Sequence, residues 1–332
     1  MSELYLMIEP LLPAAWTVVK VILVVVAALV HVAWAPYFER KVVGHMQARL
    51  GPMVVGPHGL LQPIADAIKL FFKEDVIPAD ADKAVFFFAP VICVIAAMGG
   101  LAVLPLWDGF SVADLNIGIL YILALSSIGS YGVILAGWAS NSKYSFLGGL
   151  RSSAQVISYE ITMGLSLVGV MMLAGSANLS DIVRAQSRLP FAVLQPLAFF
   201  LFMTAAVAET NRAPFDLPEA ETELVAGYFT EYSGMRFALF FMAEYTGMFV
   251  MSAMAVVCFL GGWHGPAWGP LAYVPGLAWF LLKLYALMFF YFWIRATLPR
   301  YRYDQLMDLG WKLFLPLALA NIALTGLARL FL

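Results

Sequence analysis

Long apolar runs without charges alternate with shorter polar segments along this chain of 332 residues. Each run has about 20 residues, which as an α-helix is long enough to cross a hydrocarbon core about 30 Å thick. The pattern predicts an all-α polytopic membrane protein, built as a single membrane domain over residues 1–332 with eight transmembrane helices. We place these spans at residues 13–36, 84–106, 117–139, 153–177, 190–208, 237–263, 276–294 and 311–328, the last being the shortest.

A different periodicity marks the segment that follows the first span. Within residues 58–74, Gln62, Asp66, Lys69 and Lys73 recur at helical spacing, and most large apolar side chains fall on the other side. This pattern predicts an amphipathic helix in the membrane interface. The helix has two possible roles. It is either a surface anchor in which Asp66 and Lys69 form an i, i+3 pair, or the wall of a cavity that Asp66 faces.

Composition agrees with a membrane protein and excludes several other classes. The chain is 62% hydrophobic and 12% charged, with a mean hydropathy of +0.86 and a net charge of −2, so we expect no nucleic-acid partner. Cys93 and Cys258 lie in separate apolar runs, and the four histidines are scattered. Neither set has the spacing of a zinc, haem or iron–sulfur site. We therefore expect no metal and no redox cofactor bound by this chain, so any electrons must come from another subunit.

The distribution of cations predicts the orientation in the membrane. The segments after spans 1, 3, 5 and 7 carry 14 of the 19 Lys and Arg residues, whereas the opposite segments and the C-terminus carry three. Cytoplasmic loops are enriched in these residues. Both termini are therefore expected on the outer side of a bacterial plasma membrane, and the first span, which has no positively charged leader before it, is expected to be retained.

An acidic cytoplasmic loop at residues 209–236 stands out in a chain with so few charges. The stretch AETNRAPFDLPEAETELVAGYFTEYSG (208–234) holds six carboxylates but a single arginine, Arg212. Asp216 and Glu219 have the spacing of a capping box, which predicts a short helix directly after Asp216. Capping does not explain why Glu219 and Glu223 place like charges at i, i+4, an arrangement that is mildly unfavourable.

Two further acids, Glu160 and Glu244, lie inside predicted spans. A charge at the centre of a membrane helix costs about 2.5–3.5 kcal/mol on insertion scales. One interpretation is a structural glutamate that is protonated and hydrogen-bonded between helices. The other is a row of proton stations leading from the cytoplasmic side into the membrane, formed by Glu160, Glu209, Glu219, Glu221, Glu223 and Glu244.

A third polar segment, RATLPRYRYDQLMDLGWK (295–312), combines cations with two tyrosines. We expect it to dock onto an acidic partner surface or onto lipid headgroups.

Three long motifs resemble signatures of one known family. AETNRAPFDLPEAETELVAGYFTEYSGMRFALFFMAEY (208–245), FERKVVGHMQARLGPMVVGPHGLLQPIADAIKLFFKED (38–75) and the 295–312 segment are similar to the H subunit of bacterial NADH:quinone oxidoreductase, the subunit 1 family of respiratory complex I. The resemblance runs essentially from end to end, and the motifs follow in the same order.

The resemblance implies a function. It implies a membrane subunit that forms much of a quinone-access cavity, begins an acidic chain into the membrane arm, and contacts the peripheral redox arm, neighbouring membrane subunits and lipids. Quinone would be the substrate, while flavin and iron–sulfur clusters would belong to partner subunits. Cavity or loop positions would be Arg40, Arg49, Asp66, Arg212 and Asp216; the acidic chain would comprise the six glutamates of the proposed row. On this view Arg212, which neighbours Glu209 in the sequence, holds the pKa values of the acidic cluster down in one state and releases them in another.

Three alternatives remain open from the sequence. A membrane-bound hydrogenase, or another dehydrogenase that does not use NADH, contains a related subunit. A stand-alone ion or solute transporter is a second alternative, although we find no internal repeat and the polar segments lie on one side. The third is a purely structural anchor.

Overall fold

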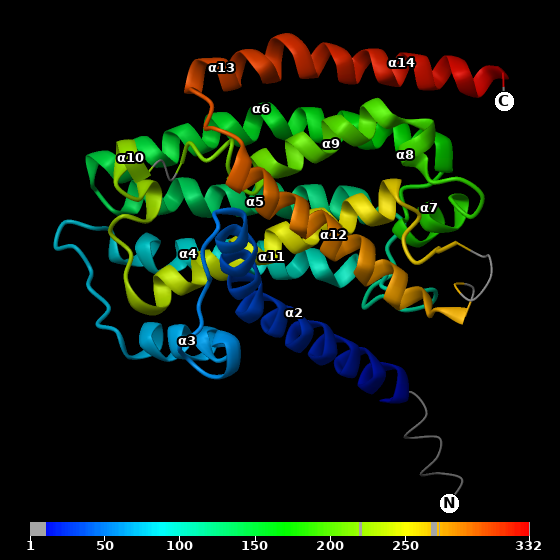
Figure 1. The fold of residues 1–332 in the computed structure, drawn as a ribbon. Coiled ribbons are helices and arrows are strands. Elements are labelled where there is room, and N and C mark those ends of the chain that lie inside the picture. Colours follow the sequence, from blue (N-terminus) through cyan, green and yellow to red (C-terminus); the bar gives the residue numbers. More distant parts are fainter. Residues whose placement is uncertain (1–10, 219–220, 267–270, 272, 332) are drawn as a thin grey trace, which may run out of the picture.

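The computed structural model describes the whole chain except residues 1–10, 219–220, 267–270, 272 and 332 (Figure 1). Secondary structure in the described part is helical apart from one isolated β-bridge between Trp107 and Phe110. The α-helices are α2 (Leu11–Met46), α3 (Gln62–Phe72), α4 (Lys83–Gly100), α5 (Gly118–Ala139), α6 (Lys143–Ala174), α7 (Leu179–Ala185), α8 (Phe191–Leu194), α9 (Pro196–Glu209), α10 (Glu221–Leu224), α11 (Gly234–Phe259), α12 (Gly276–Thr297), α13 (Tyr303–Asp308) and α14 (Leu315–Phe331).

The helices form a bundle with α9 and α11 near its centre. α4 packs on α5, α5 on α6, and α6 on both α9 and α14, while α11 contacts α4 and α12, and α12 contacts α2. Much of both central helices is buried, as Leu201, Phe202 and Phe259 illustrate. This burial explains why α9 and α11 can carry ionisable groups, because neighbouring helices shield those groups from lipid.

One end of the bundle, which we call the long-loop end, carries residues 47–82, 210–233 and 298–302. α3 and α10 lie at this end, whereas the start of α2, the end of α14, α7 and α8 lie toward the opposite end (Figure 1). The cation-rich segments therefore gather on one side of the bundle.

Seven helical stretches in the described residues are long and apolar enough to span a membrane, and α9 is a shorter apolar helix. The all-α polytopic fold is thus confirmed. The predicted span 190–208 is interrupted, because the backbone at Gln195 leaves the helical region between α8 and α9. Pro196 follows directly, and a residue before proline disfavours the helical region. The 14 residues of α9 extend about 21 Å.

Three boundaries differ from the prediction. α2 continues to Met46 and α6 begins at Lys143, each about ten residues beyond the apolar run, because these extensions bury residues such as Glu39 and Ser145 inside the bundle. The last span is not the shortest, since α13, a π-helical segment (Leu309–Phe314) and α14 form one stretch from Tyr303. Much of the predicted docking segment 295–312 is consequently helical.

The predicted amphipathic helix exists but is shorter, spanning α3. His58 and Gly59 have positive φ values of 54° and 80°, and a side chain at Gly59 would collide with the backbone of Pro52. The chain therefore turns sharply before the helix starts. The apolar residues of this region remain exposed, including Ile64, Ile68 and Phe72.

The predicted capping box joins Asp216 to Glu219, and Glu219 lies outside the described residues, as does the side chain of Glu221. α10 is described from Glu221, and the Asp216 carboxylate accepts a hydrogen bond from Arg300 at 2.7 Å. Asp216 thus has a long-range ion-pair partner in the segment after α12.

Candidate functional site

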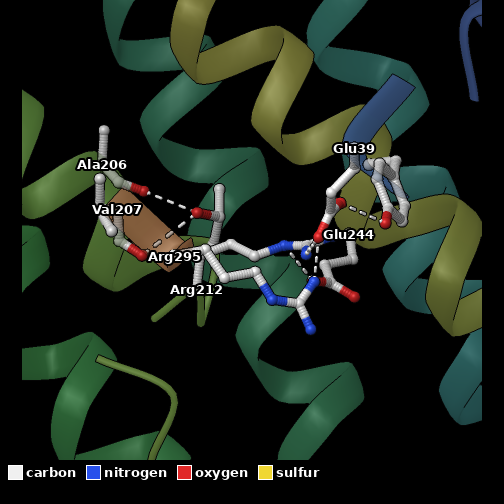
Figure 2. Close-up of polar contacts among 8 residues, drawn as sticks. Glu39, Ala206, Val207, Arg212, Glu244 and Arg295 are labelled. Atoms are coloured by element: carbon white, nitrogen blue, oxygen red, sulfur yellow. Dashed lines mark hydrogen bonds and ion pairs between the residues drawn. The ribbon is translucent and has the colours of Figure 1, made fainter. Parts of the chain in front are cut away.

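A buried ionic cluster lies where α2, α11, α12 and the loop after α9 meet. Arg212 Nη1 lies 3.2 Å from Glu39 Oε1, and Arg212 Nε lies 2.5 Å from Glu244 Oε1. Arg295 also contacts Glu39, and the Tyr245 hydroxyl donates a 2.6 Å hydrogen bond to it. Figure 2 shows both guanidinium groups pointing toward the two glutamates. We call Glu39, Arg212, Glu244 and Arg295 the ionic cluster.

The end of α9 positions Arg212. The Thr210 hydroxyl donates to the carbonyls of Ala206 and Val207 at 3.0 and 3.2 Å, and Asn211 adopts a positive φ of 51° (Figure 2). The helix therefore stops and turns Arg212 inward. Gln155 of α6 holds this turn, because its amide donates 2.7 Å hydrogen bonds to the carbonyls of Ala208 and Phe215. Such side-chain bonds replace the backbone partners that a helix end lacks.

The ionic cluster is electrically balanced, with two carboxylates and two guanidinium groups. Glu39 and Arg212 are only 5% exposed. Burial works against the charge on Arg212, but Glu244, then Tyr245 and Glu39, raise its pKa well above the ordinary value. The Arg212 guanidinium also lies over the Tyr245 ring, 4.5 Å from its centroid. Buried charges persist only when paired in this way, and removing one partner is strongly destabilising.

A second pair of acids, Glu209 and Glu160, lies against α5. The Ser126 hydroxyl donates to Glu209 of α9, and the Ser127 hydroxyl donates to Glu160 of α6. Both serines belong to α5, which packs against α6. Adjacent residues of one helix thus hold two carboxylates from two other helices.

A small cavity of about 120 Å³, which we call the inner cavity, reaches one acid of each set. Its lining includes Glu244 of the ionic cluster, Glu209 and Ser126 of the second pair, and the polar side chains of Asn211 and Ser130. A buried water needs roughly 10–15 Å³ and two to four polar partners. The cavity therefore has room for several waters between Glu244 and Glu209.

A larger cavity of about 400 Å³ opens at the long-loop end between α2, α3 and α11. Arg40 and Asp66 form a 2.8 Å ion pair at its wall, and the Gln62 amide donates to the other oxygen of Asp66 at 2.9 Å. Tyr37 and Phe241 line the apolar part. Asp66 thus faces a cavity, and its ion-pair partner is Arg40 of α2 rather than Lys69.

Asp216 lies in the loop after α9. Burial raises the pKa of its carboxyl, and the positive charge of Arg300 acts in the opposite direction. One of its oxygens is buried without a hydrogen-bond partner among the described residues. Asp216 is therefore a partly buried acid with an ion-pair partner in the segment after α12.

The remaining predicted residues lie outside these clusters. Arg49 is exposed in the turn after α2 and donates to Gln47 at 2.8 Å. Glu223 pairs with Arg151 at 2.6 Å and its side chain is 53% exposed. Arg212, which we expect to tune the acidic cluster, pairs with Glu244 of that cluster and with Glu39, and not with its sequence neighbour Glu209.

Four residues of the candidate site are not indicated by any sequence pattern above: Glu39, Arg295, Ser126 and Ser127. Glu39 sits among cations in the FERK stretch, where a surface charge is the ordinary interpretation. A helical projection of α2 offered one signal, since Glu39 follows the buried positions Ala28 and Ala35 by eleven and four residues. Serines in an apolar helix carry no comparable signal.

A family model described as NADH dehydrogenase matches residues 19–326. The chain belongs to this family. It is 55% identical over 331 residues to an NADH-quinone oxidoreductase H subunit of Geobacter sulfurreducens, covering 93% of this chain and 94% of that protein. It is 54% identical to the H subunit of Paramagnetospirillum magneticum, covering 95% of this chain and 93% of the relative, and 56% identical to that of Thermomicrobium roseum, covering 90% and 92%.

Membership in the NADH dehydrogenase family confirms the resemblance drawn from the three motifs. The matched residues include all four members of the ionic cluster, together with Glu160 and Glu209. In the described residues, no group of three or more His, Cys, Asp and Glu side chains is arranged to hold a metal ion.

Proposed function

We propose that this membrane subunit of an NADH:quinone oxidoreductase forms much of the quinone cavity and couples quinone reduction to proton translocation. One observation carries the proposal: a series of buried and partly buried carboxylates leads from the cavity at the long-loop end into the helix bundle. The ionic cluster, the 120 Å³ cavity and the pair Glu209 and Glu160 are its successive parts.

The 400 Å³ cavity suits an amphipathic substrate such as a quinone. Its wall combines the Arg40–Asp66 pair with aromatic and aliphatic side chains from α2, α3 and α11. Ligand sites are typically apolar, with a few polar groups that fix orientation. Flavin and iron–sulfur clusters would reside in partner subunits, which would reduce a quinone bound here.

Adjacent residues of α2 join the cavity to the acids. Arg40 pairs with Asp66 at the cavity wall, whereas Glu39 pairs with Arg212 in the ionic cluster. A change in charge near Arg40 would alter the balance of the ionic cluster, in which Glu39 pairs with both arginines. Glu244 faces the inner cavity, so a proton taken up there can move through water toward Glu209.

The long-loop end would face the cytoplasm of a bacterium and bind the peripheral redox arm. The cation count supports this orientation. The exposed apolar residues Leu50 and Val54, which are 71% and 94% exposed, support docking of a partner at this end.

The test compares two activities of the intact complex in proteoliposomes. Glu209→Gln and Glu244→Gln should lower proton translocation per NADH oxidised much more than they lower electron transfer to an artificial acceptor. Glu223→Gln, which changes an exposed pair, serves as the matched control. Wild-type proton translocation in both buried-acid variants would refute the coupling proposal, and quinone reduction with hydrogen but not NADH would refute the assignment of the donor.

A further inference from the structure

The serine pair of α5 occupies the point where the inner cavity ends. Ser126 and Glu209 line the cavity, but Ser127 and Glu160 do not. Glu160 nevertheless lies against the same turn of α5 as Glu209, because the adjacent residues Ser126 and Ser127 donate to the two carboxylates. A proton that continues from Glu209 to Glu160 would therefore pass from the acid held by Ser126 to the acid held by Ser127.

The Ser127 hydroxyl has two acceptors for its single proton. It lies within hydrogen-bond distance of Glu160 and 3.1 Å from the carbonyl of Leu123. When Glu160 is ionised, Ser127 donates to it. When Glu160 is protonated, Ser127 donates to the Leu123 carbonyl and accepts a hydrogen bond from the carboxyl O–H group. Rotation of one hydroxyl thus accommodates both protonation states.

Ser126 has the corresponding relation to Glu209. Its hydroxyl donates to one carboxylate oxygen, while the other oxygen of Glu209 is buried without a partner within the described chain. Because Ser126 also lines the cavity, its hydroxyl can donate to a cavity water once Glu209 is protonated. A fixed donor such as a backbone amide would favour only the ionised form.

Resting on the proposed function, we propose that Ser126 and Ser127 are positioning residues for proton transfer between Glu209 and Glu160. In this step the O–H bond of protonated Glu209 breaks and an O–H bond on Glu160 forms, so one proton moves and no electron does. The Ser126 hydroxyl, which donated to the cavity water, now donates to the Glu209 carboxylate. The Ser127 hydroxyl, which donated to Glu160, now donates to the Leu123 carbonyl. Each serine keeps one proton throughout.

Alanine variants of the intact complex test the role of the hydroxyls. Ser126→Ala combined with Ser127→Ala should lower proton translocation per NADH about tenfold, while electron transfer to an artificial acceptor and the yield of assembled complex stay near wild type. Ser126→Thr combined with Ser127→Thr should restore most of the translocation, because threonine retains the hydroxyl. Ser140→Ala is the matched control, since the buried Ser140 at the end of α5 donates its hydroxyl to the backbone carbonyl of Ala136 at 2.7 Å and does not line the cavity.

The outcomes separate this inference from the proposed function. If Glu209→Gln abolishes translocation while the double alanine variant pumps like wild type, the serine role is overturned and the acidic chain stands. If the threonine variant is as defective as the alanine variant, a packing role explains the loss and the inference fails.

A second measurement tests the inference even if the double variant assembles poorly. Infrared difference spectra of the Ser127→Ala complex should show a carboxyl C=O band, assigned by its loss in Glu160→Gln, at higher frequency than in wild type. An unchanged band would overturn the inference independently of pumping.

Discussion

Removing the charge of Glu39 should strongly disturb the ionic cluster, because Glu39 pairs with both arginines. Glu39→Gln leaves two arginines facing Glu244 alone, so the buried cluster gains a net charge of +1. At the 3.2 Å separation of Arg212 and Glu39, the lost attraction is about 5 kcal/mol for an effective dielectric constant of about 20. Breaking a buried pair typically costs about 3–5 kcal/mol, which agrees with this value.

Combining Glu39→Gln with Arg295→Gln checks the estimated cost of removing the Glu39 charge. Arg295→Gln restores neutrality, and its own cost should be smaller because the Arg295 side chain is 45% exposed. The double variant Glu39→Gln with Arg295→Gln should therefore be more stable than the sum of the single changes by about 1–3 kcal/mol. Asp108→Asn is a control, because it disrupts an exposed ion pair with Arg184 and should cost less than about 1 kcal/mol.

Hydrogen exchange of the intact complex measures the effect where it arises. Exchange of the amides at residues 206–215 reports the free energy of local opening around Arg212. A loss of about 3–5 kcal/mol corresponds to exchange about 10²–10⁴ times faster in Glu39→Gln. Exchange within a few-fold of wild type in that variant, or strict additivity in the double variant, would refute the reasoning from buried charge.

Three further changes test other parts of the structure. Asp66→Asn frees Arg40 at the cavity wall and should raise the KM for quinone several-fold with little effect on NADH oxidation by an artificial acceptor; an unchanged KM would exclude Asp66 from the quinone site. Gly148→Ala places a methyl group 2.7 Å from the backbone nitrogen of Tyr228 and should destabilise the packing of α6 by about 1–3 kcal/mol, seen as a lower melting temperature, whereas Gly164→Ala in the same helix meets no atom within 4 Å and should not. Burial raises the pKa of Asp216, so the folded loop binds the carboxyl proton more tightly than the unfolded loop does. Protonation of Asp216 therefore stabilises the fold below about pH 4, and this stabilisation is lost as pH rises through the folded pKa. Hydrogen exchange of the loop, corrected for its intrinsic rate, should therefore become faster with rising pH, and Asp216→Asn should remove that dependence; the same slope in both proteins would contradict the assignment.

Hydropathy alone located the membrane helices, because the thickness of the hydrocarbon core dictates the length of each apolar run. The family motifs then selected most residues of the candidate site. The ends of the helices were less predictable, because polar extensions such as Lys143–Ser152 are stabilised by the bundle rather than by lipid. The same limitation explains the broken span at Gln195, whose side chain donates to Thr325 of the last helix at 2.9 Å.

The sequence by itself determined that this is a helical membrane protein of the NADH dehydrogenase family, with its acids concentrated in a few segments. Only the tertiary structure decided which charges meet. Arg212 lies three residues from Glu209 but pairs with Glu39, 173 positions away, and Ser127 reaches Glu160 across 33 positions. The physical reason is that a buried charge must find a partner wherever the packed helices place one, and helix packing brings together residues that no local pattern relates.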